Sequence, residues 1–229
     1  MTNPRITAQS LLRETFATTK PLYAPLLTIN FPNLILSAIN SLDTLGSAGV
    51  VFYIIYSFVA IPFLSGAMIF YTYRSLNRNQ VTIGQAFNQA NRRLLHLVLV
   101  YIMFVGLVFV GFIVLIIPGL YVSYRLIFSL YATVIDNSSA VDSLSSSWEL
   151  TKGRWWLVFR ASLLILIVVF VPILLIILLI SSTGNLLVSK LVGNILGFLA
   201  GPLMNVYLVL LYLRLQESAA TIKETSPEN

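Results

Sequence analysis

Long runs of apolar residues divide this chain, and short polar segments separate them. A helix needs about 20 apolar residues to cross the roughly 30 Å hydrocarbon core of a membrane, and each run approaches or exceeds that length. The runs are residues 22–42, 48–72, 95–117, 119–135, 155–180 and 187–213. The pattern therefore predicts an all-α polytopic membrane protein with about six transmembrane helices in one membrane domain, residues 1–217.

The third and fourth runs are separated only by Ile117-Pro118-Gly119. Proline cannot continue a helix and glycine tolerates a tight turn, so this break predicts two neighbouring antiparallel helices. The fourth run, 119–135, is the shortest of the six. The chain ends in a polar segment, 218–229, without hydrophobic periodicity, and we expect it to be a disordered cytoplasmic tail.

Three polar segments that precede odd-numbered runs have the pattern of short amphipathic helices. Thr82-x-x-Gln85 has the form of a capping box, and Ser139-x-x-Asp142 repeats the cap ahead of a Lys152-Gly153 stop. The apolar positions on their faces are Ile83, Ala86, Phe87 and Ala90 in one, Ala140, Leu144 and Trp148 in another, and Ala8, Leu11, Leu12 and Phe16 after Thr7. We expect three cytoplasmic interfacial helices and interpret the chain as three repeated units, each an interfacial helix followed by two spans.

Composition agrees with this reading and adds an orientation. Apolar residues make up 58% of the 229 residues, charged residues 10%, and the mean hydropathy is +0.89, which excludes a water-soluble fold. The net charge of +6 arises from cations that flank apolar runs, so it indicates topology and we expect no nucleic-acid partner. Cations before the first run, between the second and third, and after the sixth predict cytoplasmic N- and C-termini.

Two runs carry polar or small residues on one face. Gly193, Gly197 and Gly201 form GxxxGxxxG in the sixth run, a spacing that lets another backbone approach closely. The same face includes Lys190, Asn194, Asn205 and Tyr212, while the first run has a polar stripe of Asn30, Asn33, Ser37, Asn40 and Ser41. We expect the two stripes to meet inside the bundle. Two interpretations remain open, interhelix packing or the lining of a polar cavity, and the glycine face equally permits contact with a second copy of the chain or another membrane protein.

A cluster of cations and tryptophans marks the start of the fifth run. Trp155 and Trp156 follow Lys152 and Arg154, at the depth that indoles and cations favour in membranes. Arg125 lies within the fourth run, where an arginine costs about 3 kcal/mol unless it is paired or reaches headgroups. We interpret these five residues as candidate contacts to a lipid headgroup; a plain interfacial belt and, for Arg125, a structural anchor are the alternatives.

The sequence contains no recognisable catalytic motif. His96 is the single histidine, cysteine is absent, and the acids show no paired spacing. We therefore expect no catalytic residue, no cofactor and no metal site.

Two stretches resemble a known family. Ile117-Pro118-Gly119-Leu120-Tyr121 with Arg125, and the segment from Ser147 to Trp156, are similar to the glycerophosphoryl diester phosphodiesterase membrane-domain family and related uncharacterised six-helix bacterial membrane proteins. The resemblance covers the membrane region only, and we expect no phosphodiesterase barrel. It implies a fold and a bacterial plasma (inner) membrane setting, and it transfers no catalytic residue.

The leading hypothesis is a non-catalytic multi-pass protein that binds membrane lipid or a membrane protein partner. The first alternative is a small transporter or permease, motivated by the polar stripes and Arg125. A membrane-embedded lipid enzyme is the weakest alternative, because the sequence offers no acid, base or nucleophile for it.

Overall fold

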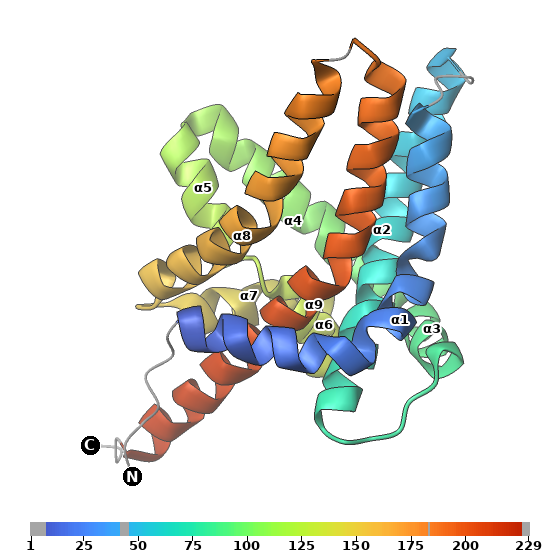
Figure 1. Ribbon diagram of the computed structural model, residues 1–229. Coiled ribbons are helices and arrows are strands. Elements are labelled where there is room, and N and C mark those ends of the chain that lie inside the picture. Colours follow the sequence, from blue (N-terminus) through green and yellow to red (C-terminus); the bar gives the residue numbers. More distant parts are fainter. Residues whose placement is uncertain (1–7, 42–45, 183, 226–229) are drawn as a thin grey trace.

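The protein is all-helical in the residues that the computed structural model describes, 8–41, 46–182 and 184–225 (Figure 1). The helices are α1 (Ala8–Ser41), α2 (Gly46–Leu76), α3 (Ile83–Arg92), α4 (Leu94–Val114), α5 (Ile116–Arg125), α6 (Ser129–Ile135), α7 (Ala140–Thr151), α8 (Trp155–Ser181) and α9 (Leu186–Thr225). Among them, α1, α2, α4, α8 and α9 are long and apolar enough to cross a membrane.

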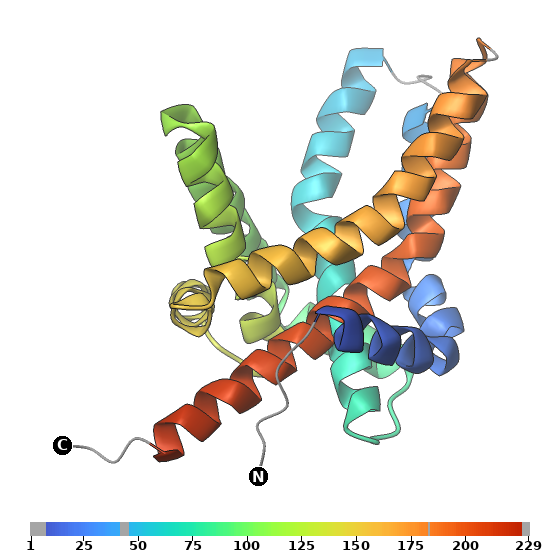
Figure 2. The same cartoon turned by 60° about the vertical axis from the view of Figure 1, so that its left-hand side comes forward.

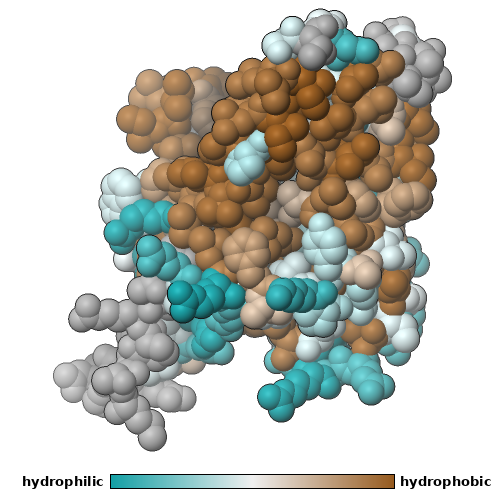
Figure 3. Space-filling view, in the orientation of Figure 1, coloured by the Kyte–Doolittle hydropathy of each residue, from teal (hydrophilic) through white to brown (hydrophobic). Residues whose placement is uncertain are grey.

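Helices α1 and α2 form one long hairpin, and α8 and α9 form another. The start of α1, the end of α2, α3, α7 and the end of α9 gather at one end of the molecule, which we call the charged end (Figures 1 and 2). On the face shown in Figure 3, hydrophilic residues gather at this end, whereas hydrophobic residues cover the helices above it. The α4/α5 pair is a third, shorter hairpin, and it returns the chain to the charged end.

The expected fourth span, 119–135, is not a single helix. Helix α5 has 10 residues and is therefore about 15 Å long, half of the thickness of a bilayer core. It ends at Arg125, a turn follows, and α6 starts at Ser129. In Figures 1 and 2 the tip of the α4/α5 hairpin stops short of the level reached by the other two tips. The predicted fourth span is thus not one continuous helix, because the chain breaks beside Arg125. The sixth membrane crossing stays a prediction.

Two glycines hold α4 and α5 together. A Cβ atom built on Gly111 would lie 2.9 Å from the Gly119 Cα, and one built on Gly119 would lie 2.5 Å from Phe112 Cγ. The hairpin turns at Leu115, whose backbone is extended, so Pro118 occupies the first turn of α5 and not the break itself. Proline is tolerated there because the first N–H groups of a helix have no intrahelical acceptor.

Two of the three expected interfacial helices are separate helices in the structure, and the third is the start of α1. The Thr82 capping box is confirmed, with both hydrogen bonds formed, and Ser139 caps α7 through the Asp142 N–H. Near the N-terminus no separate helix forms: α1 runs across the charged end and then turns upward (Figure 1), with Pro21 and Pro25 inside it. Leu11 is buried there but Phe16 is exposed, and Thr7 lies outside the described residues. The three-unit repeat stays a prediction.

Helix α9 is the central element. It packs most extensively against α1 and also contacts α8 and α2, and its segment from Val206 to Leu215 is largely buried. It continues as a helix to Thr225, so the expectation of disorder from residue 218 is wrong for 218–225. Alanines 219 and 220 favour continuation of an existing helix, and Arg214 pairs with Glu217 one turn on. Residues 226–229 lie outside the described chain.

Candidate functional site

The break between α5 and α6 is bound by hydroxyl groups of α7. The carbonyl oxygen of Arg125 accepts hydrogen bonds from Ser147 Oγ at 2.9 Å and from Thr151 Oγ1 at 3.2 Å. The Phe128 N–H donates to the same Ser147 Oγ at 3.1 Å. Non-helical backbone at membrane depth persists only where protein satisfies its polar groups, and these fully buried hydroxyls do so.

The Arg125 side chain is buried without an anionic partner. It is 3% exposed, and its guanidinium carbon lies 4.2 Å from the Trp148 ring centroid and 5.8 Å from that of Tyr121. Its Nε has no hydrogen-bond partner, and no carboxylate in the described part of the chain forms an ion pair with it. Cation–π contact is worth about 2 kcal/mol when desolvated, whereas burying a lone charge costs several kcal/mol. Arg125 Nε is therefore left without a hydrogen-bond acceptor in the described part of the chain.

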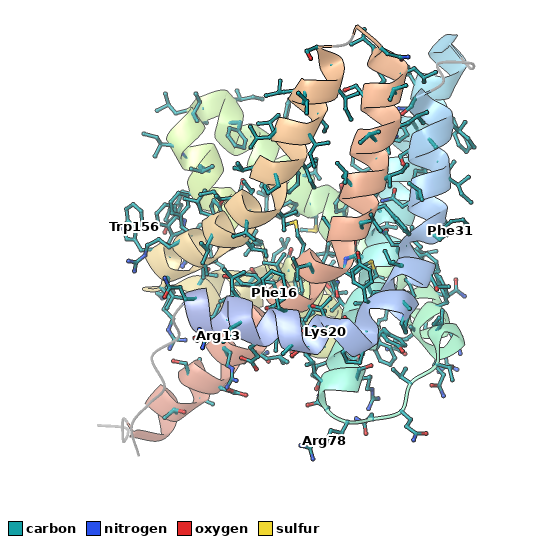
Figure 4. The ribbon with its side chains drawn as sticks, viewed as in Figure 1. Arg13, Phe16, Lys20, Phe31, Arg78 and Trp156 are labelled. Carbon is teal, nitrogen blue, oxygen red and sulfur yellow. The ribbon has the colours of Figure 1, made fainter. Side chains whose placement is uncertain are left out.

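The aromatic rings around Arg125 continue onto α8. The Tyr121 ring centroid lies 5.7 Å from that of Trp155, and Trp155 stacks on Phe159 at 5.1 Å. The indole N–H of Trp155 is buried and, like Arg125 Nε, has no partner. Trp156, in contrast, is 64% exposed and lies at the edge of the molecule (Figure 4). We call Tyr121, Arg125, Trp148 and Trp155 the arginine cluster; it contains two buried donors without acceptors.

The two other predicted headgroup cations lie outside this cluster. Lys152 is exposed and pairs with Glu149 across 3.4 Å. Arg154 is half-buried, and its Nη1 donates to the Leu215 carbonyl at 3.0 Å, which ties the start of α8 to α9. The structure thus brings Arg125 and Trp155 into one aromatic cluster and gives Lys152 and Arg154 protein partners.

The polar residues predicted in the first and sixth runs meet between α1 and α9. Asn194 Nδ2 donates to the Ser37 carbonyl at 3.1 Å and to Ser41 Oγ at 2.8 Å. A Cβ built on Gly201 would lie 3.1 Å from Asn30 Nδ2, so this glycine faces α1. Asn33 is half-buried on α1.

The other predicted residues of the α9 face, Gly193, Gly197 and Asn205, do not face α1: two of them contact other helices and one contacts none. A Cβ on Gly193 would lie 3.1 Å from Ile177 of α8, whereas one on Gly197 would meet nothing within 4 Å. Asn205 Oδ1 accepts from Thr72 of α2 at 2.7 Å. The glycine face is therefore divided among several neighbours.

Sequence reasoning missed a polar network between the end of α6 and α9. Tyr212 OH donates to Asp136 Oδ2, and Gln216 Nε2 donates to both Asp136 oxygens at 3.0–3.1 Å. It also missed the hydroxyl face of α7, formed by Ser143, Ser147 and Thr151, all fully buried. The available signal was their four-residue spacing, which places three small hydroxyls on one helix face.

These features define an all-α multi-pass membrane protein with a half-length helical hairpin and a buried arginine at its base. In the described residues no group of three histidine, aspartate or glutamate side chains is placed to hold a metal ion. The chain belongs to the family described as domain of unknown function (DUF7847), whose sequence model matches residues 81–215. No curated protein and no solved structure matches the chain. The match extends from the start of the α3 cap into α9 and includes the whole arginine cluster.

Proposed function

We propose that this protein is a non-catalytic membrane protein that binds an anionic phospholipid through the arginine cluster, with the charged end facing the cytoplasm. The observation that carries the proposal is the Arg125 guanidinium, which is buried on Trp148 and whose Nε has no acceptor in the described residues. An arginine fork matches the geometry of a phosphate and binds it through two parallel hydrogen bonds.

The position of the cluster supports a lipid ligand. It joins the end of α5 to the start of α8 beside the exposed Trp156 (Figure 4). At this level the hydrophobic surface gives way to hydrophilic residues (Figure 3). Tryptophan and cationic side chains favour this interfacial depth. The orientation follows from the cations at this end, since cytoplasmic loops carry the excess of lysine and arginine.

Transport receives less support. It would require polar side chains that remain available to a substrate within the bundle. Asn194 and Asn205 instead bond to Ser37, Ser41 and Thr72, which favours helix packing.

The test compares wild type with Arg125→Met by native mass spectrometry after gentle extraction, with Arg13→Met as a matched control. Arg13 is an exposed arginine of α1 at the charged end (Figure 4), so its loss measures general attraction of lipid to positive charge. We expect wild type and Arg13→Met to retain the same amount of anionic phospholipid and Arg125→Met to retain less. Equal retention by all three would overturn the proposal.

A second measurement separates a binding role from a structural one. Thermal unfolding is followed in lipid-free detergent and then with added phosphatidylglycerol. Removing a lone buried charge leaves the lipid-free protein as stable or more stable, while the stabilisation by lipid is lost. A large loss of stability in lipid-free detergent would instead make Arg125 a structural anchor.

A further inference from the structure

A second polar feature lies at the corner where α2 leads into α3. A cavity of about 420 Å³ opens there, within the range of roughly 300–1,000 Å³ typical of small-molecule sites. Two arginines, Arg74 and Arg92, line it together with five amide side chains, and its apolar lining is Phe70 and Val81. The amides belong to Asn79, Gln80, Gln85, Asn88 and Gln89. No acidic residue lines the cavity.

The amphipathic pattern of α3 produces this lining. Its apolar face packs into the core, with Ala86 and Ala90 buried and Phe87 stacked on Phe63 of α2 at 5.8 Å. The opposite face consists of Gln85, Asn88, Gln89 and Arg92, which recur at i, i+3, i+4 and i+7 and all line the cavity. The remaining walls are the last turns of α2 and the 79–81 connection. Hydrophilic atoms cover this corner of the molecule (Figures 1 and 3).

Both arginines are available to a ligand. In the described chain neither guanidinium forms an ion pair, and Arg74 is held over the Phe70 ring with its guanidinium carbon 5.4 Å from the centroid. Gln85 Oε1 accepts from the Thr82 N–H at 2.9 Å in the capping box, so its amide NH₂ is left to donate elsewhere. Two unpaired cations with no lining carboxylate make the cavity selective for anions.

We infer that this cavity binds a phosphorylated polyol. The guanidinium groups of Arg74 and Arg92 bind the phosphate, since arginine suits its oxygen geometry. The amides bind the hydroxyl groups, because each amide carries both donors and an acceptor, as a hydroxyl does. The amides lie at the open, solvent-exposed side of the cavity, where they can exchange water for ligand hydroxyl groups next to the two arginines. The site is independent of the arginine cluster, because no residue of that cluster lines it.

The phosphorylated polyol has two possible sources, a soluble metabolite or the headgroup of a lipid, and the experiment separates them. The purified full-length protein is placed in phosphatidylcholine nanodiscs and titrated with glycerol phosphate, myo-inositol phosphate and inorganic phosphate. In parallel, the Arg125→Met variant in nanodiscs that contain phosphatidylglycerol or phosphatidylinositol tests the lipid-linked forms, so that lipid bound by the arginine cluster does not contribute. Binding of the soluble compounds identifies a metabolite site; binding of the lipid forms alone identifies a headgroup site. Either supports the inference.

Variants on the cavity surface then test the contacts. Arg74→Gln combined with Arg92→Gln should weaken polyol phosphate binding at least tenfold, since two charge-assisted contacts are lost. Asn88→Leu should weaken the polyol phosphates several-fold and leave inorganic phosphate unchanged. Arg78→Gln is the matched control, because Arg78 lies in the same connection, points away from the body of the protein and does not line the cavity (Figure 4).

Three results would overturn the inference. They are no binding of any probe, inorganic phosphate binding as tightly as the polyol phosphates, or equal loss in Arg78→Gln and the double variant. Arg125→Met should leave the binding of soluble glycerol phosphate and myo-inositol phosphate unchanged, so failure here is distinguishable from failure of the proposed function.

Discussion

The Ser147 hydroxyl donates a hydrogen bond to the Arg125 carbonyl oxygen across 2.9 Å. The next residue along, Trp148, carries the ring on which the Arg125 guanidinium rests. One short stretch of α7 therefore binds both the backbone and the side chain of Arg125. The α7 stretch thus satisfies polar groups that the helix break after Arg125 exposes.

Replacing Ser147 by alanine should destabilise the fold by about 1–3 kcal/mol. The Phe128 N–H would lose its side-chain acceptor, and the Arg125 carbonyl would keep only the longer bond from Thr151. The measurement is thermal or denaturant unfolding in a mild detergent. Ser146→Ala provides the control, since Ser146 is the exposed neighbour on the same helix. Equal stability of the two variants would show that the break does not depend on this hydroxyl.

The glycine contact in the α4/α5 hairpin makes a second prediction. Gly111→Ala should destabilise the protein by about 1–3 kcal/mol, because the new methyl group would press against the backbone of Gly119, which has no side chain to move aside. Gly106→Ala lies on the same helix with open space around it, so it should be neutral or stabilise by up to about 1 kcal/mol. Both variants are compared by the midpoint of unfolding; the same midpoint for both would contradict the close approach.

The sequence was most informative where the signal is local. Apolar runs predicted α1, α2, α4, α8 and α9 to within several residues at most ends, and the Thr82 and Ser139 caps were predicted because a cap depends on residues three positions apart. The prediction of one helix for the fourth run was wrong because the apolar pattern continues past Arg125, whereas the helix ends there and a new helix begins at Ser129. Hydropathy measures the environment of a segment, and 119–135 is apolar on both sides of the turn.

Long-range contacts in the candidate site were harder to predict. The sequence singled out Arg125 and Trp155 separately, but their shared aromatic cluster depends on Tyr121, which packs between Trp148 and Trp155 in three dimensions. Lys152 and Arg154 were grouped with them because they are close in sequence. In the structure Arg154 instead donates to the Leu215 carbonyl of α9, and no local sequence pattern predicts a contact between residues so far apart in the chain.

The energetic coupling between Asn194 and Ser41 can be measured with a double-mutant cycle. Asn194→Leu should lower stability by about 0.6–2 kcal/mol, the range found for hydrogen bonds between membrane helices. A double-mutant cycle with Ser41→Ala isolates the pair, and we expect a coupling energy of at least 0.5 kcal/mol, an estimate typical of residues in contact. Asn40→Leu, at an exposed position of α1, is the matched control. Additive effects of the two substitutions would mean that Asn194 does not depend on Ser41.

The depth of the α4/α5 hairpin can be tested with single cysteines, because the natural chain contains none. Ile117, at the tip, is 81% exposed in the protein, and we expect it to face hydrocarbon. Ile117→Cys should therefore resist a membrane-impermeant maleimide from both sides, since the reactive thiolate requires water. Arg78→Cys, beyond the end of α2, should react only from the cytoplasmic side, and Asn185→Cys, between α8 and α9, only from the outside. Labelling of Ile117→Cys from outside would mean that the hairpin crosses the whole bilayer, and labelling of Arg78→Cys from outside would reverse the proposed orientation.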